Sequence, residues 1–192
     1  EIKTSAKSLI PIFASCLGGL LISGAPACGK TTALRDLVRR ISSGEAGGSR
    51  KVAVIDERGE IAAVHGGMPQ YDVGPNTDVI SGINKADGIM MALRAMSPDV
   101  IVFDEIGAAE EISALRQSLN AGVRVITTIH SGSIQQLLLR PQMQQIIESC
   151  AFSRVVQLSG RGAASHIEEV YDLEEAYAKA YRSSGNYIVY DG

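Results

Sequence analysis

The sequence predicts one α/β domain, in which helices flank a mostly parallel sheet and the chain ends in an antiparallel hairpin. Short apolar runs alternate with helical patterns, as in successive βαβ units. The central runs (VAVID, VIVFD and VRVITTI) are continuously apolar and rich in β-branched residues, which is typical of strands covered on both faces. A Gly-rich turn over residues 159–164 joins the last two apolar runs, and it predicts the hairpin.

The elements follow from these patterns in order. Strands are expected at 19–23, 51–56, 100–104, 123–129, 155–158 and 167–171. Helices are expected at 30–42, 84–96, 110–121, 133–150 and 174–181. Residues 42–49 form a flexible connection. Residues 63–76 form a Gly/Pro-rich loop whose length is typical of functional loops.

Composition narrows the class of protein. The chain has 192 residues, 45% of them hydrophobic, so it suits one folded domain and not a disordered segment. The 18 basic and 21 acidic residues give a net charge of −3, which argues against a protein that coats nucleic acid. The three cysteines are widely spaced and form no metal-ligand pattern, so we expect reduced thiols in a cytoplasmic protein.

One uncharged stretch has the length of a membrane span. It covers the 22 residues between Lys7 and Lys30. Six glycines and prolines divide it into apolar runs that are too short to cross a bilayer. We interpret it as an amphipathic entry segment followed by the first strand and a phosphate-binding loop.

That loop is the strongest motif in the chain. Residues 24–31 (GAPACGKT) match GxxxxGK[ST] between a predicted strand and a predicted helix. The glycines let the backbone wrap around phosphate, and the helix N-terminus adds positive potential. Lys30 is expected to reach the β- and γ-phosphates of ATP, and Thr31 to bind Mg²⁺. The other predicted nucleotide contacts are Gly24, Ala25, Pro26, Ala27, Cys28, Gly29 and Thr32, with Cys28 expected to fill space and not to act as a nucleophile.

A second acidic motif follows the strand VIVF. Asp104 is expected to hold Mg²⁺, and Glu105 to polarise an attacking water. Adjacent carboxylates at this position favour hydrolysis by water over transfer of phosphate to a second metabolite.

Two shorter matches suggest a GTPase, and their order argues against it. DEIG at 104–107 fits DxxG, and NKAD at 84–87 fits the guanine-reading NKxD. In GTPases of the usual order NKxD follows DxxG and closes a buried strand, whereas here it comes first. We interpret Asn84 and Asp87 as the capped start of a helix.

Polar residues also end the remaining central strands. Glu57 and Arg58 follow VAVID, and His130 follows VITTI. Ligands of doubly wound sheets bind beyond the carboxyl ends of the strands, so we expect these side chains near the γ-phosphate. His130 is expected to sense that phosphate or to orient the nucleophilic water. A transition-state arginine for a neighbouring subunit has five candidates: Arg58, Arg94, Arg140, Arg154 and Arg161.

The motifs together resemble the type II/type IV secretion ATPase superfamily. The segments GAPACGKTT, VIDERGEI, LRAMSPDVIVFDEIG and TTIH occur in the order of its Walker A, Asp box, Walker B and His box. The stretch from residue 1 to about 154 is more closely similar to the stage III sporulation protein AA family, including the Asp104-Glu105 pair where secretion ATPases carry Gly-Glu.

The resemblance implies a RecA-like P-loop ATPase domain over residues 1–192, with a further family domain upstream of this chain. It implies Mg²⁺-dependent hydrolysis of ATP that energises or assembles the channel between mother cell and forespore. It further implies a ring hexamer in the mother-cell cytoplasm, held at a membrane by integral membrane partners, with no nucleic acid involved. Two alternatives stay open: a nucleotide-dependent scaffold with little turnover, and a RecA-like DNA translocase, although the loop 63–76 has no Lys or Arg.

Overall fold

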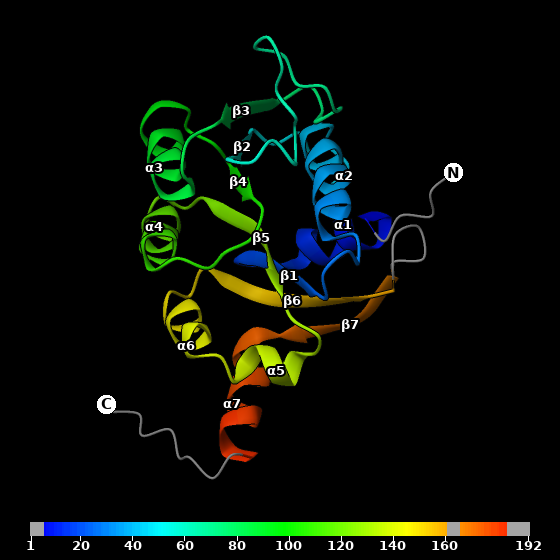
Figure 1. Ribbon diagram of the computed structural model, residues 1–192, viewed down its shortest axis with the longest axis vertical. Helices are drawn as coiled ribbons and strands as arrows, with labels where there is room; N and C mark the ends of the chain where they lie inside the picture. Colours follow the sequence, from blue (N-terminus) through cyan, green and yellow to red (C-terminus); the bar gives the residue numbers. More distant parts are fainter. Residues whose placement is uncertain (1–5, 161–165, 184–192) are drawn as a thin grey trace.

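The computed structural model describes residues 6–160 and 166–183, and within them the chain forms a seven-stranded sheet between two layers of helices (Figure 1). The strand order is β3-β2-β4-β5-β1-β6-β7, and all neighbours are parallel except β6 and β7. The predicted fold class is therefore confirmed. The strands are β1 (Gly19–Gly24), β2 (Val52–Asp56), β3 (Thr77–Ser81), β4 (Val100–Phe103), β5 (Arg124–His130), β6 (Phe152–Ser159) and β7 (His166–Asp172).

The helices cover both faces of the sheet. They are α1 (Ala6–Ser15), α2 (Lys30–Ser42), α3 (Lys85–Ala95), α4 (Ala109–Asn120), α5 (Ile134–Leu138), α6 (Pro141–Glu148) and α7 (Leu173–Ser183). Alternate residues of each strand point to opposite faces, so β1 supplies Leu20 and Ile22 to the core under α1 and α2. Leu21 belongs to the second core, under α3, α4, α5 and α6. Burial on both faces explains why the central strands are continuously apolar.

Two helices begin as the sequence predicts. Gly29, with a φ of 87°, precedes α2 in the left-handed conformation that glycine adopts readily. Asn84 caps α3, because its side chain accepts a hydrogen bond from the backbone N–H of Asp87. The NKAD segment is thus a helix start, as expected.

Apart from α1, which was expected only as an amphipathic entry segment, the structure differs from the expected elements at two places. The single helix expected over 133–150 is two helices, α5 and α6. Pro141 lacks an N–H and starts α6, and it holds Arg140 in an extended conformation that ends α5. The edge strand β3 was not predicted, because its half-exposed sequence TDVIS contains only one short apolar run.

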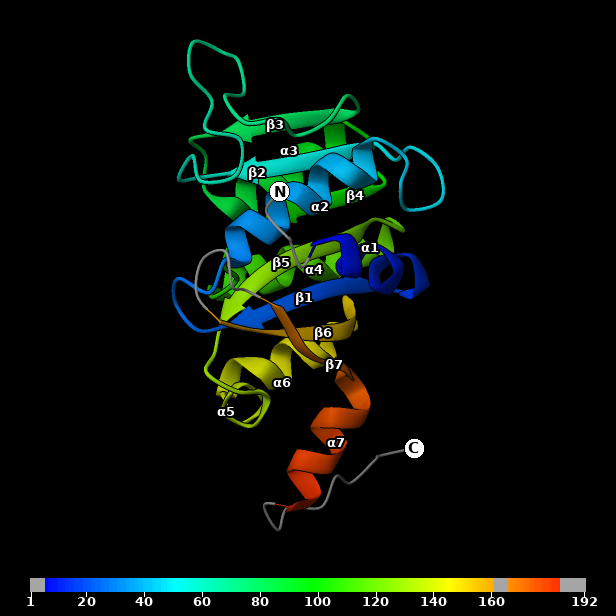
Figure 2. The same ribbon diagram turned by 90° about the vertical axis from the view of Figure 1, so that its right-hand side faces the viewer.

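The uncharged N-terminal stretch forms most of α1, then β1 and the loop before α2. This agrees with the expected entry segment, first strand and loop. Within the described residues, no helix has both the length and the apolar character needed to cross a membrane. Figure 2 shows the connection between β2 and β3 projecting beyond the sheet at one end of the molecule, with α7 at the opposite end. Arg161 and most of the Gly-rich turn lie outside the described residues.

Candidate nucleotide site

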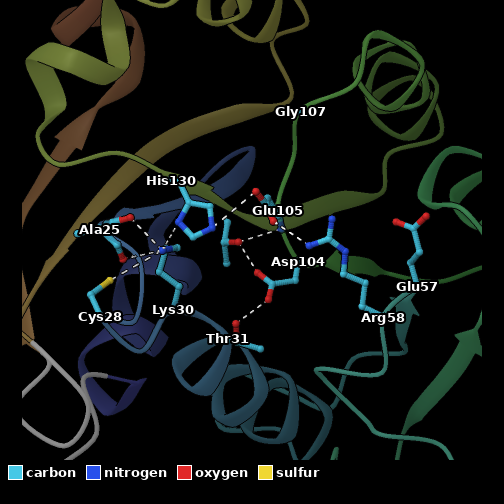
Figure 3. Close-up of polar contacts among 12 residues, drawn as sticks. Ala25, Cys28, Lys30, Thr31, Glu57, Arg58, Asp104, Glu105, Gly107 and His130 are labelled. Carbon is cyan, nitrogen blue, oxygen red and sulfur yellow. Dashed lines mark hydrogen bonds and ion pairs between the residues drawn. The ribbon is translucent and has the colours of Figure 1, made fainter.

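The predicted site residues come from four different strand ends, and the sheet places them along one edge. β1, β2, β4 and β5 are parallel, so their carboxyl ends meet there. Lys30, Asp104, Glu105 and His130 converge at this edge, with Arg58 beside Glu105 (Figure 3).

The loop between β1 and α2 is folded tightly enough to need its glycines. A Cβ atom on Gly24 would lie 2.4 Å from Sγ of Cys28, which is impossible without movement of the loop. Cys28 is 1% exposed and belongs to the hydrophobic core below α2, which agrees with its expected space-filling role. The loop ends at Gly29, directly before the N-terminus of α2, where an anion is favoured.

Lys30 is the buried cation of this loop. Its ammonium donates to the carbonyl oxygens of Gly24 and Ala25, both at 2.9 Å, and lies 2.9 Å from Nδ1 of His130. Burial lowers the pKa of Lys30, opposed by the nearby Cys28, Asp104 and Glu105. The ammonium is thus held at the mouth of the loop, within reach of any phosphate bound there.

Asp104 meets Thr31 on the other side of the loop. The Thr31 hydroxyl donates to Oδ2 of Asp104 at 2.6 Å, and the Thr128 hydroxyl donates to Oδ1. Hydroxyl and carboxylate oxygens are the protein ligands that Mg²⁺ prefers. The donor set therefore fits the predicted Mg²⁺ ion, with Thr31 and Asp104 as the residues that would hold it directly or through water.

Glu105 follows Asp104 in an unusual backbone conformation. Its φ is 59°, a left-handed value that a non-glycine residue seldom adopts. The Glu105 N–H donates to Oγ1 of Thr128 at 2.9 Å, and its carbonyl accepts from Nζ of Lys85 at 2.5 Å. The carboxylate lies 3.6 Å from Nε2 of His130 and 3.4 Å from Nη1 of Arg58. The backbone is thus fixed while the Glu105 side chain stays 43% exposed.

These groups line an open cleft of about 390 Å³, a size typical of small-molecule sites. Its lining residues are Ala27, Gly29, Lys30, Thr31, Thr32, Glu60, Asp104, Glu105 and His130. The lining contains one buried ammonium and a helix N-terminus, which favour phosphate, and several carboxylates, which favour a divalent cation. A nucleotide with a divalent cation therefore fits the charges of the cleft.

The other predicted residues lie at different distances from the cleft. Glu57 lines a smaller neighbouring hollow and lies 3.9 Å from Nζ of Lys85. Arg58 contacts Glu105 from an exposed position. Pro26 is an exposed residue of the loop. Arg154 pairs with Asp172 of β7 at 3.6 Å, and this contact engages it away from the cleft.

Three residues of the site were not predicted from the sequence. Thr128 holds both Asp104 and Glu105, and its position two residues before His130 on β5 was the available signal, because alternate strand residues share a face. The buried carboxylate of Asp56 accepts four backbone N–H bonds from residues 60–63 and so shapes the loop after β2. Lys85 lies in the NKAD segment, in which only Asn84 and Asp87 were assigned a role, as the capped start of a helix.

Comparison with known proteins finds a matching family and a similar sequence. The sequence model of the family described as "Sporulation stage III, protein AA" matches residues 1–177. Stage III sporulation protein AA of Bacillus subtilis (strain 168) is 40% identical over 171 residues, covering 88% of this chain and 56% of that protein. The chain therefore spans little more than half the length of this relative.

Solved structures of an ATPase and of a pilus motor share the fold. The Legionella pneumophila ATPase DotB superposes with a TM-score of 0.60 at 21% identity, covering 92% of this chain and 51% of DotB. The pilus retraction motor PilT, solved with bound ADP, gives a TM-score of 0.63 at 17% identity, covering 93% of this chain and 55% of PilT. These similarities confirm the P-loop ATPase fold.

Proposed function

The chain belongs to the sporulation stage III protein AA family, and on that premise we propose that it is a Mg²⁺-dependent ATPase that uses water as the nucleophile. One observation carries the proposal: the Glu105 carboxylate faces the same cleft as Lys30 and the Thr31–Asp104 pair. A general base, a phosphate-binding cation and a metal-binding pair within one cleft are the parts that phosphoryl transfer to water requires.

The roles of the residues follow from their positions. The backbone of residues 25–29 and the N-terminus of α2 bind the phosphates, and Lys30 leaves the loop carbonyls to bind the β- and γ-phosphates. Mg²⁺, when bound, neutralises charge that develops on the phosphate oxygens. Glu105 accepts a proton from water, and His130 orients that water or the carboxylate from the end of β5.

Two further residues extend the site. Arg58 stabilises negative charge near Glu105, either in this subunit or across a contact with the next one. Glu57 acts from the neighbouring hollow through Lys85. The geometry supports these two roles less directly than the role of Glu105, because neither Arg58 nor Glu57 lines the main cleft.

The cellular role is proposed from the family and from the motors that share the fold. We propose a ring of copies of this protein, a hexamer, in the mother-cell cytoplasm, bound at a membrane by integral membrane partners and energising or assembling the mother cell–forespore channel. Light scattering with and without a non-hydrolysable ATP analogue tests the ring. A monomer under both conditions contradicts assembly by this protein alone.

Phosphate release by the purified protein tests hydrolysis. Glu105→Gln keeps the size of the side chain and removes the base, so we expect turnover to fall by about 100-fold or more while an ATP analogue still binds. Glu110→Gln is the matched control, because Glu110 is an exposed residue of the first turn of α4. A wild-type rate no higher than that of Glu105→Gln would contradict an ATPase and leave a nucleotide-dependent scaffold.

A further inference from the structure

We propose that Lys85 is a positioning residue for Glu105: it holds the Glu105 backbone in the conformation that turns the carboxylate into the cleft. The inference rests on the proposed role of Glu105 as the general base. It assigns a task to the lysine of the NKAD segment, which otherwise serves as the start of α3.

The Glu105 backbone needs external support. A non-glycine residue in the left-handed region is strained and persists only where its surroundings hold it. One support comes from β5, where Thr128 binds the Glu105 N–H through its hydroxyl and the Ile106 N–H through its carbonyl. These bonds fix the amides of the turn but leave the Glu105 carbonyl to be held from elsewhere.

Lys85 supplies that second support. Its Nζ donates to the Glu105 carbonyl at 2.5 Å and to Oε1 of Glu111 at 2.9 Å. The Lys85 side chain is 13% exposed and the Glu111 side chain 8% exposed. Because both charges are largely removed from water, each is stabilised by the other. Oε2 of Glu111 in turn accepts from the N–H groups of Gly107 and Ala108 at 2.8 and 3.1 Å. The turn over residues 105–108 is thus bound by β5 on one side and by the Lys85–Glu111 pair on the other.

The packing of α3 explains how Lys85 reaches this turn. Asn84 caps the helix, so Lys85 is its first residue. Gly88 faces β2, where an added Cβ would lie 2.4 Å from Cγ2 of Ile55, and the absence of a side chain brings the start of α3 close to the sheet. The same placement puts Nζ of Lys85 3.9 Å from Glu57, so the lysine links the ends of β2 and β4.

Kinetics of Lys85→Met separate positioning from nucleotide binding. Without the ammonium, we expect the Glu105 backbone to relax and the carboxylate to shift. A displacement of about 1 Å reduces turnover by roughly 100-fold. Because Lys85 does not line the nucleotide cleft, KM and the affinity for an ATP analogue should stay within about twofold of wild type. Lys85→Arg, which keeps the charge and the donors, should recover part of the lost turnover.

A second variant and a control keep the test independent of folding. Lys85→Met leaves the Glu111 charge buried without its cation, whereas Lys85→Met/Glu111→Gln removes that charge and should fold more stably while still losing turnover. Lys51→Met is the matched control, because Lys51 makes an exposed ion pair with Asp78 at 3.4 Å next to the edge strand. Wild-type turnover in the double variant would overturn the proposal, because the loss would then come from the buried charge alone.

Amide hydrogen exchange at residues 104–108 tests positioning without any turnover. We expect exchange in this segment to be at least about tenfold faster in Lys85→Met than in the wild type, with no change in Lys51→Met. Equal exchange in wild type and Lys85→Met would overturn the proposal. A wild-type protein that hydrolyses no ATP would contradict the proposed function instead, and the exchange result would then decide the role of Lys85 by itself.

Discussion

The ammonium of Lys30 lies 2.9 Å from Nδ1 of His130, so the first residue of α2 is joined to the last residue of β5. Because an ammonium can only donate, Nδ1 is the acceptor, and Nε2 carries the proton that faces Glu105 at 3.6 Å. We expect a phosphate that draws Lys30 away from the loop also to release His130 toward Glu105. The contact would then connect nucleotide binding to the proposed general base.

Removal of this link should slow hydrolysis more than it weakens binding. We expect His130→Ala to lower the turnover number by about 100-fold, because the water or Glu105 loses its orienting group. Affinity for an ATP analogue should be retained, since Lys30 no longer has to leave the histidine. Steady-state hydrolysis and analogue titration measure the two quantities. His65→Ala, at an exposed position in the loop after β2, is the control, and equal rates for both variants would count against the role of His130.

The Asp104 carboxylate should strengthen the binding of a nucleotide together with Mg²⁺, and not the binding of the nucleotide alone. Asp104→Asn keeps the shape of the side chain and removes the negative charge beside Thr31. We expect the affinity for an ATP analogue to fall roughly tenfold or more in Mg²⁺ and to stay unchanged in EDTA. Titrations in the two buffers check this, with the exposed Asp78→Asn as control. A similar loss in both buffers would mean that Asp104 does not act through the metal.

The stability of the loop after β2 should depend on Gly74, because this position has a left-handed backbone and leaves no room for a side chain. Gly74 has a φ of 85°, and a Cβ there would lie 2.8 Å from the carbonyl oxygen of Arg39. Gly67 has a φ of 80°, with nothing within 4 Å of the added atom. Gly67→Ala should therefore lower the free energy of unfolding by about 1 kcal/mol, and Gly74→Ala by about 2–3 kcal/mol. Urea denaturation measures the difference, and equal losses would rule out the close approach to α2.

Asp36 should contribute stability that disappears in acid. Burial raises the pKa of its carboxyl, but hydrogen bonds from Arg40 and Arg39 outweigh burial and leave the pKa below its ordinary value. The folded pKa is thus below the unfolded value of about 3.9, so the stabilisation is present above that pH and is lost as the pH falls through the folded pKa. We expect Asp36→Asn to lower the free energy of unfolding by about 1 kcal/mol at pH 7.

The pH dependence is the decisive part of that prediction. The difference between wild type and Asp36→Asn should stay constant from pH 7 to about pH 5 and shrink toward pH 3. Urea denaturation across this range measures it. A difference that is as large at pH 3 as at pH 7 would show that Asp36 acts through packing and not through its charge.

Local sequence was sufficient for much of the fold. The apolar runs of β2, β4 and β5 predicted a sheet buried on both faces, because such runs are stable only under that burial. The glycines and Lys30 predicted the loop and the helix after it, because left-handed backbone and close approach to phosphate require those residue types. Polar residues at the ends of parallel strands predicted which edge carries the site.

Tertiary structure alone decided which of those polar groups touch. β5 lies between β4 and β1, and this order brings Thr128 to Asp104 and His130 to Lys30. The edge strand β3 and the reach of Lys85 to Glu105 likewise depend on packing partners. Periodicity in a sequence encodes which face of an element is buried, whereas contacts between residues far apart in the chain arise only when the elements pack.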